Sequence, residues 1–155
     1  MDELNNLIPQ VVTEGIDLSL ARIKQALNEV GNPCKGIPAI HVVGTNGKGS
    51  ITSFIKSSLN CHKIKVGVTT SPHLKSWCER ISINDELIPY EKLKEEIIRF
   101  KPLAQRNNLT TFELLVAIAF DYFSANKVEL IVLEAGLGGR LDATTAHSYR
   151  PIIAI

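Results

Sequence analysis

One stretch of the sequence constrains the fold more than any other, because it joins an apolar run, a glycine-rich turn and an amphipathic segment. Residues 37–43 have the apolar character of a buried strand, and residues 44–49 contain three glycines and one lysine. From Ser50 onward, apolar residues recur at helical spacing, at Ile51, Phe54, Ile55 and Leu59. The sequence therefore predicts a strand, a tight glycine turn and a helix in direct succession.

A glycine turn of this kind suits a polyphosphate. Glycines let backbone N–H groups point into the turn, and the start of the next helix adds the positive end of its dipole. Lys48 would add a positive charge that reaches the β- and γ-phosphates. The usual pattern G-x-x-x-x-G-K-[ST] is not met, because Val42 replaces its first glycine and Gly49 its hydroxyl residue. The alternative is a flexible surface turn.

The composition limits the class of protein. A chain of 155 residues fits about one domain, and 45% hydrophobic with 21% charged residues is ordinary for an α/β protein. The 17 basic and 16 acidic side chains give no charge pattern for nucleic acid or an anionic membrane, so we expect neither as a partner. The acidic start of the chain, and no apolar run near the ~20 residues of a membrane span, predict a cytoplasmic protein.

Two polar residues follow or end further predicted strands. Residues 65–70 form a short strand that stops at Ser71, and residues 128–134 form a buried strand that ends in Glu134. Because parallel strands end at one edge of a sheet, we expect both residues beside the glycine turn. An acid that closes a buried strand is costly unless it is paired or metal-bound, which favours Glu134 as a Mg²⁺ ligand. A solvated serine in a turn and an exposed glutamate are the alternatives.

The other segments complete an α/β pattern. We expect a helix over residues 2–12, a second helix that Asp17 caps and that ends before Gly31, a helix over residues 90–100 with a solvated charged face, and a helix that begins at a Thr110 cap. Residues 79–83 and 86–88 should pair as a hairpin, residues 101–109 should form a polar connector, and a further strand should begin at Pro151. The predicted fold is a mostly parallel sheet with flanking helices around a P-loop-like nucleotide-binding core.

A second glycine-rich segment, residues 135–144, invites comparison with the dinucleotide-binding pattern G-x-G-x-x-G. That pattern would need a glycine at position 141, where this chain has Leu141, and no helical periodicity follows at once. We therefore reject a dinucleotide site.

Several strings, in matching order and spacing, resemble the folylpolyglutamate synthase/dihydrofolate synthase family of the Mur ligase superfamily. They are D-L-S-L (17–20), G-T-N-G-K-G-S (44–50), T-S-P-H-L (70–74), L-T-T-F-E (109–113) and L-E-A-G-L-G-G-R-L-D-A-T (133–144). The chain departs from the family pattern at Ser19, where a glycine is usual, at Thr111, where an aromatic is common, and at Ala135, where valine is usual.

The resemblance implies roles for particular residues. It assigns ATP binding to Gly44, Thr45, Asn46, Gly47, Lys48, Gly49 and Ser50. It assigns Mg²⁺ to Ser71 and Glu134, and catalysis to Lys48 and Glu134. It assigns the folate or pterin to Asp17, Leu18, Ser19, Thr110, Thr111, Phe112, Glu113, Asp142 and Ala143, with Arg140 bracing the last loop. For Asp17, Phe112 and Glu113, plain helix capping and packing are the structural alternatives.

The implied reaction is ATP-dependent addition of glutamate to dihydropteroate or a folate through an acyl phosphate, with ATP and Mg²⁺ as cofactors. By this resemblance, residues 1–155 are a partial ATP-binding domain, and the family's C-terminal glutamate-binding domain is absent. We expect a truncated product, a fragment or half of a split enzyme, inactive alone. A non-catalytic ATP- or pterin-binding module, and a Mur-type peptidoglycan ligase, are the alternatives; the strings at 17–20, 71–74 and 111–113 argue against the second.

Overall fold

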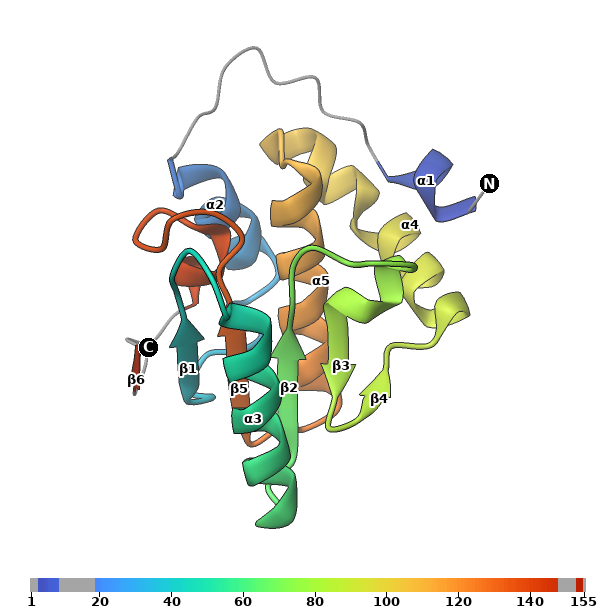
Figure 1. Cartoon of the computed structure of the whole chain (residues 1–155). Coiled ribbons are helices and arrows are strands. Elements are labelled where there is room, and N and C mark those ends of the chain that lie inside the picture. Colours follow the sequence, from blue (N-terminus) through green and yellow to red (C-terminus); the bar gives the residue numbers. More distant parts are fainter. Residues whose placement is uncertain (1–2, 9–18, 148–152, 155) are drawn as a thin grey trace.

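The computed structural model describes residues 3–8, 19–147 and 153–154 (Figure 1). The helices are α1 (Glu3–Leu7), α2 (Ala21–Glu29), α3 (Lys48–Cys61), α4 (Tyr90–Asn107) and α5 (Thr111–Ala125), with short 3₁₀ helices η1 (Trp77–Arg80) and η2 (Ala143–Ala146). The strands are β1 (Ala39–Val42), β2 (Val66–Thr69), β3 (Ile81–Ile83), β4 (Glu86–Leu87), β5 (Leu130–Glu134) and β6 (Ile153–Ala154). Residues 2 and 9–12 of the first predicted helix, the Asp17 cap and the predicted strand start at Pro151 lie outside the described residues.

Within the described residues, six strands form one sheet in the order β4-β3-β2-β5-β1-β6. Strands β2, β5, β1 and β6 are parallel, and the hairpin of β3 and β4 adds two antiparallel strands at one edge. The mostly parallel sheet predicted from the sequence is therefore confirmed, as is the hairpin around Asn84.

The register of the parallel strands brings three chain segments to one edge of the sheet. Val42 at the end of β1 is paired with Glu134 at the end of β5, and Thr69 at the end of β2 is paired with Leu133. The glycine turn, the turn at Ser71 and the loop after Glu134 therefore all start at the carboxyl edge, where open α/β sheets hold their ligands.

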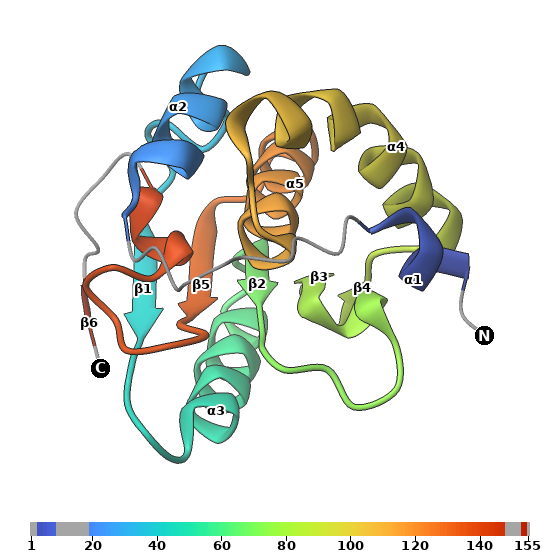
Figure 2. The ribbon, with the colours of Figure 1, turned by 90° about the horizontal axis from the view of Figure 1, so that it is seen from above.

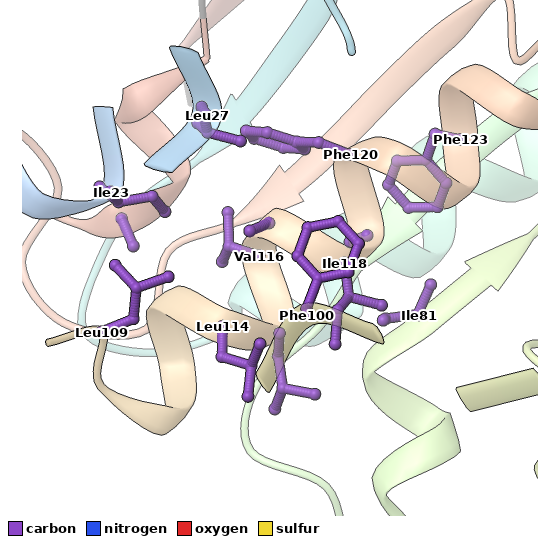
Figure 3. Close-up of a cluster of buried hydrophobic side chains, with 14 of the residues drawn as sticks. Ile23, Leu27, Ile81, Phe100, Leu109, Leu114, Val116, Ile118, Phe120 and Phe123 are labelled. Carbon is purple, nitrogen blue, oxygen red and sulfur yellow. The ribbon is translucent and has the colours of Figure 1, made fainter. Parts of the chain in front are cut away.

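The two faces of the sheet are covered unequally. Helices α2, α4 and α5 lie on one face and α3 on the other (Figure 2). The larger core fills the space under α5, whose Phe120 and Phe123 are almost fully buried (Figure 3). Under α3 only a small valine cluster is buried, formed by Val42, Val66, Val68 and Val132. The outer side of α3 leaves Phe54 72% exposed, so this helix has an apolar surface that the described chain does not cover.

The polar connector predicted over residues 101–109 is wrong, because α4 continues to Asn107. Leu103 and Ala104 are buried, so the apolar face of α4 extends beyond Phe100. Pro102 lies inside the helix, where it leaves the carbonyl four residues earlier without a helical donor. That carbonyl belongs to Ile98, which is 53% exposed, so water can satisfy it.

The central strands are each shorter than expected, and two further boundaries differ near the carboxyl edge. Helix α3 begins at Lys48, two residues before the predicted start at Ser50. Glu79, expected to open a strand, belongs instead to η1, and β3 begins at Ile81. Lys48 therefore lies in the first turn of α3, and Glu79 lies in the 3₁₀ turn that precedes β3.

Candidate functional site

The glycine turn has the predicted strand–turn–helix geometry. Gly44 (φ 139°) and Gly47 (φ 78°) adopt positive φ values, which only glycine tolerates well, and Gly47 leads directly into α3. No side chain of the described residues caps this end of α3, so its first N–H groups have no side-chain acceptor there. The Nζ of Lys48 donates to the Gly44 carbonyl at 2.9 Å, which holds its positive charge over the turn.

Glu134 lies beneath the first turn of α3. A Cβ added at Gly49 would lie 3.9 Å from both carboxylate oxygens of Glu134. The side chain is buried, and burial raises the pKa of the Glu134 carboxyl; a hydrogen bond from the Ser71 backbone and the charge of Lys48 partly offset that rise. A buried carboxylate with so little compensation is costly unless a cation completes its surroundings.

The residues at this edge fit a Mg²⁺ ion. The hydroxyl oxygen of Ser71 is buried and has no hydrogen-bond partner in the described part of the chain. The backbone of Ser71 is hydrogen-bonded to Glu134, so one hydroxyl-bearing residue and one carboxylate lie side by side at the edge that carries the glycine turn. No group of three or more His, Cys, Asp or Glu residues that could hold a metal occurs among the described residues. Mg²⁺ does not need one, since it keeps several waters and binds one or two protein oxygens beside phosphates.

A cavity of about 220 Å³ lies near the same sheet edge. It is lined by Ser19, Leu20, Arg22, Thr110, Phe112, Glu113, Leu137, Leu141, Asp142 and Ala143. Six of the residues predicted for the pterin, from three distant segments of the chain, therefore come together: Ser19, Thr110, Phe112, Glu113, Asp142 and Ala143. Thr111 is not in the lining, and Asp17 and Leu18 lie outside the described residues.

Sequence reasoning missed four residues of this lining. Leu137 (67% exposed) and Leu141 (43% exposed) face the cavity from the loop after Glu134, and apolar residues in an exposed glycine loop were the available signal. Leu20 and Arg22 come from the start of α2. Leu20 ends the D-L-S-L string and Arg22 follows it closely, and this position could have indicated that both line the cavity.

Glu113 caps the start of α5, which was the alternative to its predicted role in binding the pterin. Its carboxylate accepts from the Thr110 N–H at 2.7 Å, while the Thr110 hydroxyl accepts from the Glu113 N–H at 3.2 Å. Arg22 lies 3.5 Å from the same carboxylate oxygen. The capping box starts α5 and at the same time fixes an acid and a guanidinium in the cavity wall.

Asp142, rather than Arg140, braces the loop after β5. One carboxylate oxygen of Asp142 accepts from the N–H groups of Gly136 and Leu137, both at 2.9 Å. The other accepts from the backbone N–H and the hydroxyl of Thr144 at 3.0 and 2.7 Å. Arg140 is exposed, and its backbone carbonyl, not its guanidinium, holds the loop by accepting from a neighbouring hydroxyl. The expected brace by Arg140 is therefore replaced by one from Asp142.

The glycine turn and the cavity both pack against the loop that follows Glu134. A Cβ added at Gly139 would lie 3.2 Å from the side chain of Val43, which precedes the glycine turn. A Cβ added at Gly136 would lie 3.0 Å from the ring of Phe112, which lines the cavity. The loop that starts at Glu134 thus packs against both sites, so a molecule in the cavity lies near a phosphate held at the turn.

A strand–turn–helix phosphate loop, an acid at the end of a neighbouring strand and an adjoining cavity are features of a P-loop-type nucleotide-binding domain. Comparisons with known proteins show which proteins the chain is similar to. The chain is 40% identical over 131 residues to dihydrofolate synthetase of Saccharomyces cerevisiae, covering 83% of this chain and 31% of that protein. It is 40% identical over 148 residues to dihydrofolate synthase/folylpolyglutamate synthase of Bacillus subtilis, covering 91% of this chain and 34% of that protein.

Comparison of the folds points to the same group of proteins. A solved complex of FPGS with AMPPCP and folate superposes with a TM-score of 0.88 at 32% identity, covering 98% of this chain and 38% of that one. No protein-family model matches the chain. The chain is a homologue of the dihydrofolate synthase/folylpolyglutamate synthase proteins and shares their Mur ligase-type fold, which confirms the resemblance drawn from the sequence. It spans about a third of the length of the curated relatives it matches.

Within the described residues, no helix combines the length and the apolar character that a membrane span requires.

Proposed function

We propose that this chain forms the nucleotide- and pterin-binding part of an ATP-dependent ligase that adds glutamate to dihydropteroate or a folate. In this proposal residues 1–155 are one partial ATP-binding domain, and the glutamate site belongs to the rest of such an enzyme. The relatives named above are folate enzymes, and the FPGS structure was solved with AMPPCP and folate. A Mur-type peptidoglycan ligase is correspondingly disfavoured.

The observation that carries the proposal is the position of two sites on either side of one loop. The glycine turn and Glu134 lie at the carboxyl edge of the sheet, and the cavity lined by Phe112 and Leu137 adjoins the loop after Glu134. Transfer of a phosphoryl group from ATP to a substrate carboxylate needs the two reactants side by side, and positioning can supply much of the rate enhancement. This arrangement offers such positioning.

Each residue at the phosphate turn has a defined task in the proposal. The N–H groups of residues 44–50 bind phosphate oxygens, and Lys48 adds a fixed positive charge. Ser71 and Glu134 would hold Mg²⁺, which when bound supplies positive charge to the phosphates of ATP. The substrate carboxylate would take the γ-phosphoryl group and release ADP, and the amine of glutamate would then attack the carbonyl carbon of the acyl phosphate, displacing inorganic phosphate and losing a proton. The glutamate itself would bind in the part of such an enzyme that lies outside the matched third of the relatives.

The cavity suits a flat heteroaromatic ring with a polar edge. Phe112, Leu137 and Leu141 offer apolar surface to the faces of a ring, and Glu113 with Arg22 offers a fixed acceptor and donor at one wall. The carboxylate of Asp142 already accepts four hydrogen bonds within its own loop. We therefore assign the side chain of Asp142 to the shape of the cavity, and its backbone, with Ala143, to the contact with the pterin.

The test is the affinity of Mg·ATP for the Lys48→Ala variant. We expect about tenfold or greater weakening by calorimetry, because a charge-assisted phosphate contact contributes roughly 1.5–3 kcal/mol. Lys101→Ala is the matched control, since Lys101 is exposed on α4, which lies on the opposite face of the sheet from α3. Equal affinity in the wild type and the Lys48→Ala variant would refute the phosphate-loop assignment.

A further inference from the structure

Glu79 makes an unusual set of contacts with the segment that follows Ser71. Its carboxylate accepts hydrogen bonds from three consecutive backbone N–H groups. They belong to Leu74 (2.9 Å), Lys75 (2.8 Å) and Ser76 (2.7 Å). These hydrogen bonds hold the pKa of the Glu79 carboxyl below its ordinary value, so the group is a charged acceptor at neutral pH.

Capping of the short helix η1 explains only part of this arrangement. In the capping box, Ser76 is the N-cap and Glu79 returns one bond to the Ser76 N–H. The bonds from Leu74 and Lys75 lie before the cap and add nothing to η1. They close the segment between Ser71 and Ser76 into a compact loop around one carboxylate.

The same loop is tied at its other end to the site. The backbone of Ser71 is hydrogen-bonded to Glu134, and its hydroxyl is buried at that edge of the sheet. Thr70 is held by Glu79 itself, because its hydroxyl donates to the Glu79 carbonyl at 2.8 Å. Glu79 therefore holds both ends of the loop. Its backbone carbonyl binds Thr70 at the start, and its carboxylate binds the N–H groups of residues 74–76 at the end.

Neighbours stiffen the middle of the loop. The Nε of Arg80 donates to the Nδ1 of His73 at 2.8 Å, and the ring of His73 packs on that of Trp77 with centroids 4.3 Å apart. Arg80 also lies over the Trp77 ring, 4.9 Å from its centroid. Leu74 is 91% exposed, so the loop has almost no apolar packing of its own at its tip. Hydrogen bonds to Glu79 are what hold the tip in place.

We infer that Glu79 is a positioning residue that fixes the 71–76 loop and thereby presents the Ser71 hydroxyl to Mg²⁺ and the phosphates of ATP. The inference rests on the proposed function. The phosphate contacts proposed for residues 44–50 belong to a different segment at the start of α3, so loss of Glu79 should affect the Mg²⁺-dependent part of nucleotide affinity and spare the rest.

The experiment compares ATP affinity with and without Mg²⁺ in the 155-residue chain and its variants. Glu79→Gln keeps the size of the side chain but removes the charge that accepts three N–H groups. We expect the gain in affinity on adding Mg²⁺ to fall about fivefold or more, with metal-free affinity within about twofold of wild type. Glu95→Gln is the control, because Glu95 is an exposed acid on α4 that pairs with Lys92 at the surface. It should leave both affinities unchanged.

Hydrogen exchange at residues 74–76 gives a second readout that does not depend on nucleotide. In Glu79→Gln these amides should exchange faster while those of β5 stay protected. Glu79→Asp, which keeps the charge but shortens the reach, serves if the first variant fails to fold, and it should show a smaller loss of the Mg²⁺ gain. An undiminished Mg²⁺ gain in both variants would overturn the positioning role, whether or not the amides are released. Absence of any ATP binding in the wild type would instead overturn the proposed function.

Discussion

Glu134 combines two properties that are rarely found together without a ligand: it ends a buried central strand of the sheet, and it is an acid. Burial raises the pKa of its carboxyl, and only the Ser71 backbone and the charge of Lys48 act in the other direction among the described residues. The folded chain therefore carries a cost at neutral pH that binding of a cation would relieve. At the scale of single residues, this energetic cost is the strongest indication that Glu134 binds a cation.

Replacement of Glu134 by glutamine should separate function from stability. We expect Glu134→Gln to lose most of the Mg²⁺-dependent gain in ATP affinity but keep its metal-free binding, and Ser71→Ala to show the same effect more weakly. Calorimetry with and without Mg²⁺ measures both. An equal Mg²⁺ gain in the wild type and both variants would mean that these residues are structural and bind no metal.

The pH dependence of the wild type provides an internal check on this substitution. Mg²⁺ needs the carboxylate, so the Mg²⁺ gain should be full above the raised pKa of Glu134 and disappear as the pH falls through it. Because ionisation of the buried acid lowers stability as the pH rises through the same range, Glu134→Gln should be at least as stable as the wild type at pH 7.

The role of a residue could be predicted from the sequence where its position follows from a regular strand or helix, and not where it depends on the path of a loop. Lys48, Ser71 and Glu134 could be placed from sequence because each follows or ends an apolar strand, and parallel strands share an edge. Glu79 could not, since its three contacts depend on an irregular loop with no periodic pattern. Asp142 was assigned to the pterin, yet its side-chain bonds are all within its loop, which no spacing rule reveals.

At the scale of elements, the fit of α5 against β2 is an especially tight contact in the larger core. Gly67 of β2 faces Phe123 of α5, and a Cβ at Gly67 would lie 2.7 Å from two atoms of the ring. Phe123 is fully buried among core side chains, so it has no free space to move into (Figure 3). A glycine that looked like an ordinary strand residue in sequence is thus required for helix–sheet packing.

Gly67→Ala should destabilise the fold by about 1–3 kcal/mol, the usual range for overpacking a core. Urea denaturation followed by circular dichroism measures the change. Gly49→Ala is a matched control, because its added Cβ would make only ordinary 3.9 Å contacts and alanine favours the helix in which it lies. A Gly67→Ala variant as stable as the wild type would show that α5 can shift away from β2.

Elements with strong periodicity were predicted well, and those whose limits depend on tertiary contacts were not. The central strands, the capped start of α5 and the hairpin were expected from pattern and turn residues. Helix α4 passes through Pro102 because burial of Leu103 outweighs the lost bond. Glu96, expected on a solvated face, is buried and paired with Lys92 and Arg99; Arg99 also pairs with Asp121 and so joins α4 to α5.

At the scale of the whole molecule, the sheet is a support with one well-covered face and one thinly covered face. The covered face supplies the large core, while α3 lies over the other and leaves Phe54 and Ile51 exposed. Both proposed sites lie at the edge between these layers, so they depend on the sheet and not on the outer surface of α3 (Figure 2). The fold class and the location of the sites were predictable; the cavity wall formed by Leu137 and Leu141 was not, because it depends on the path of a loop.

The central claim is that one chain carries two adjacent sites, for a nucleotide and for a pterin. Amide chemical-shift mapping of the 155-residue chain tests it most directly. Mg·ADP should perturb residues 44–50 and Ser71, whereas dihydropteroate should perturb Ser19, Phe112 and the loop over residues 136–143, with the two sets meeting at that loop. Shifts from both ligands confined to other surfaces, such as the cavity lined by Lys65 and Tyr122 at the opposite end of β2, would contradict the account.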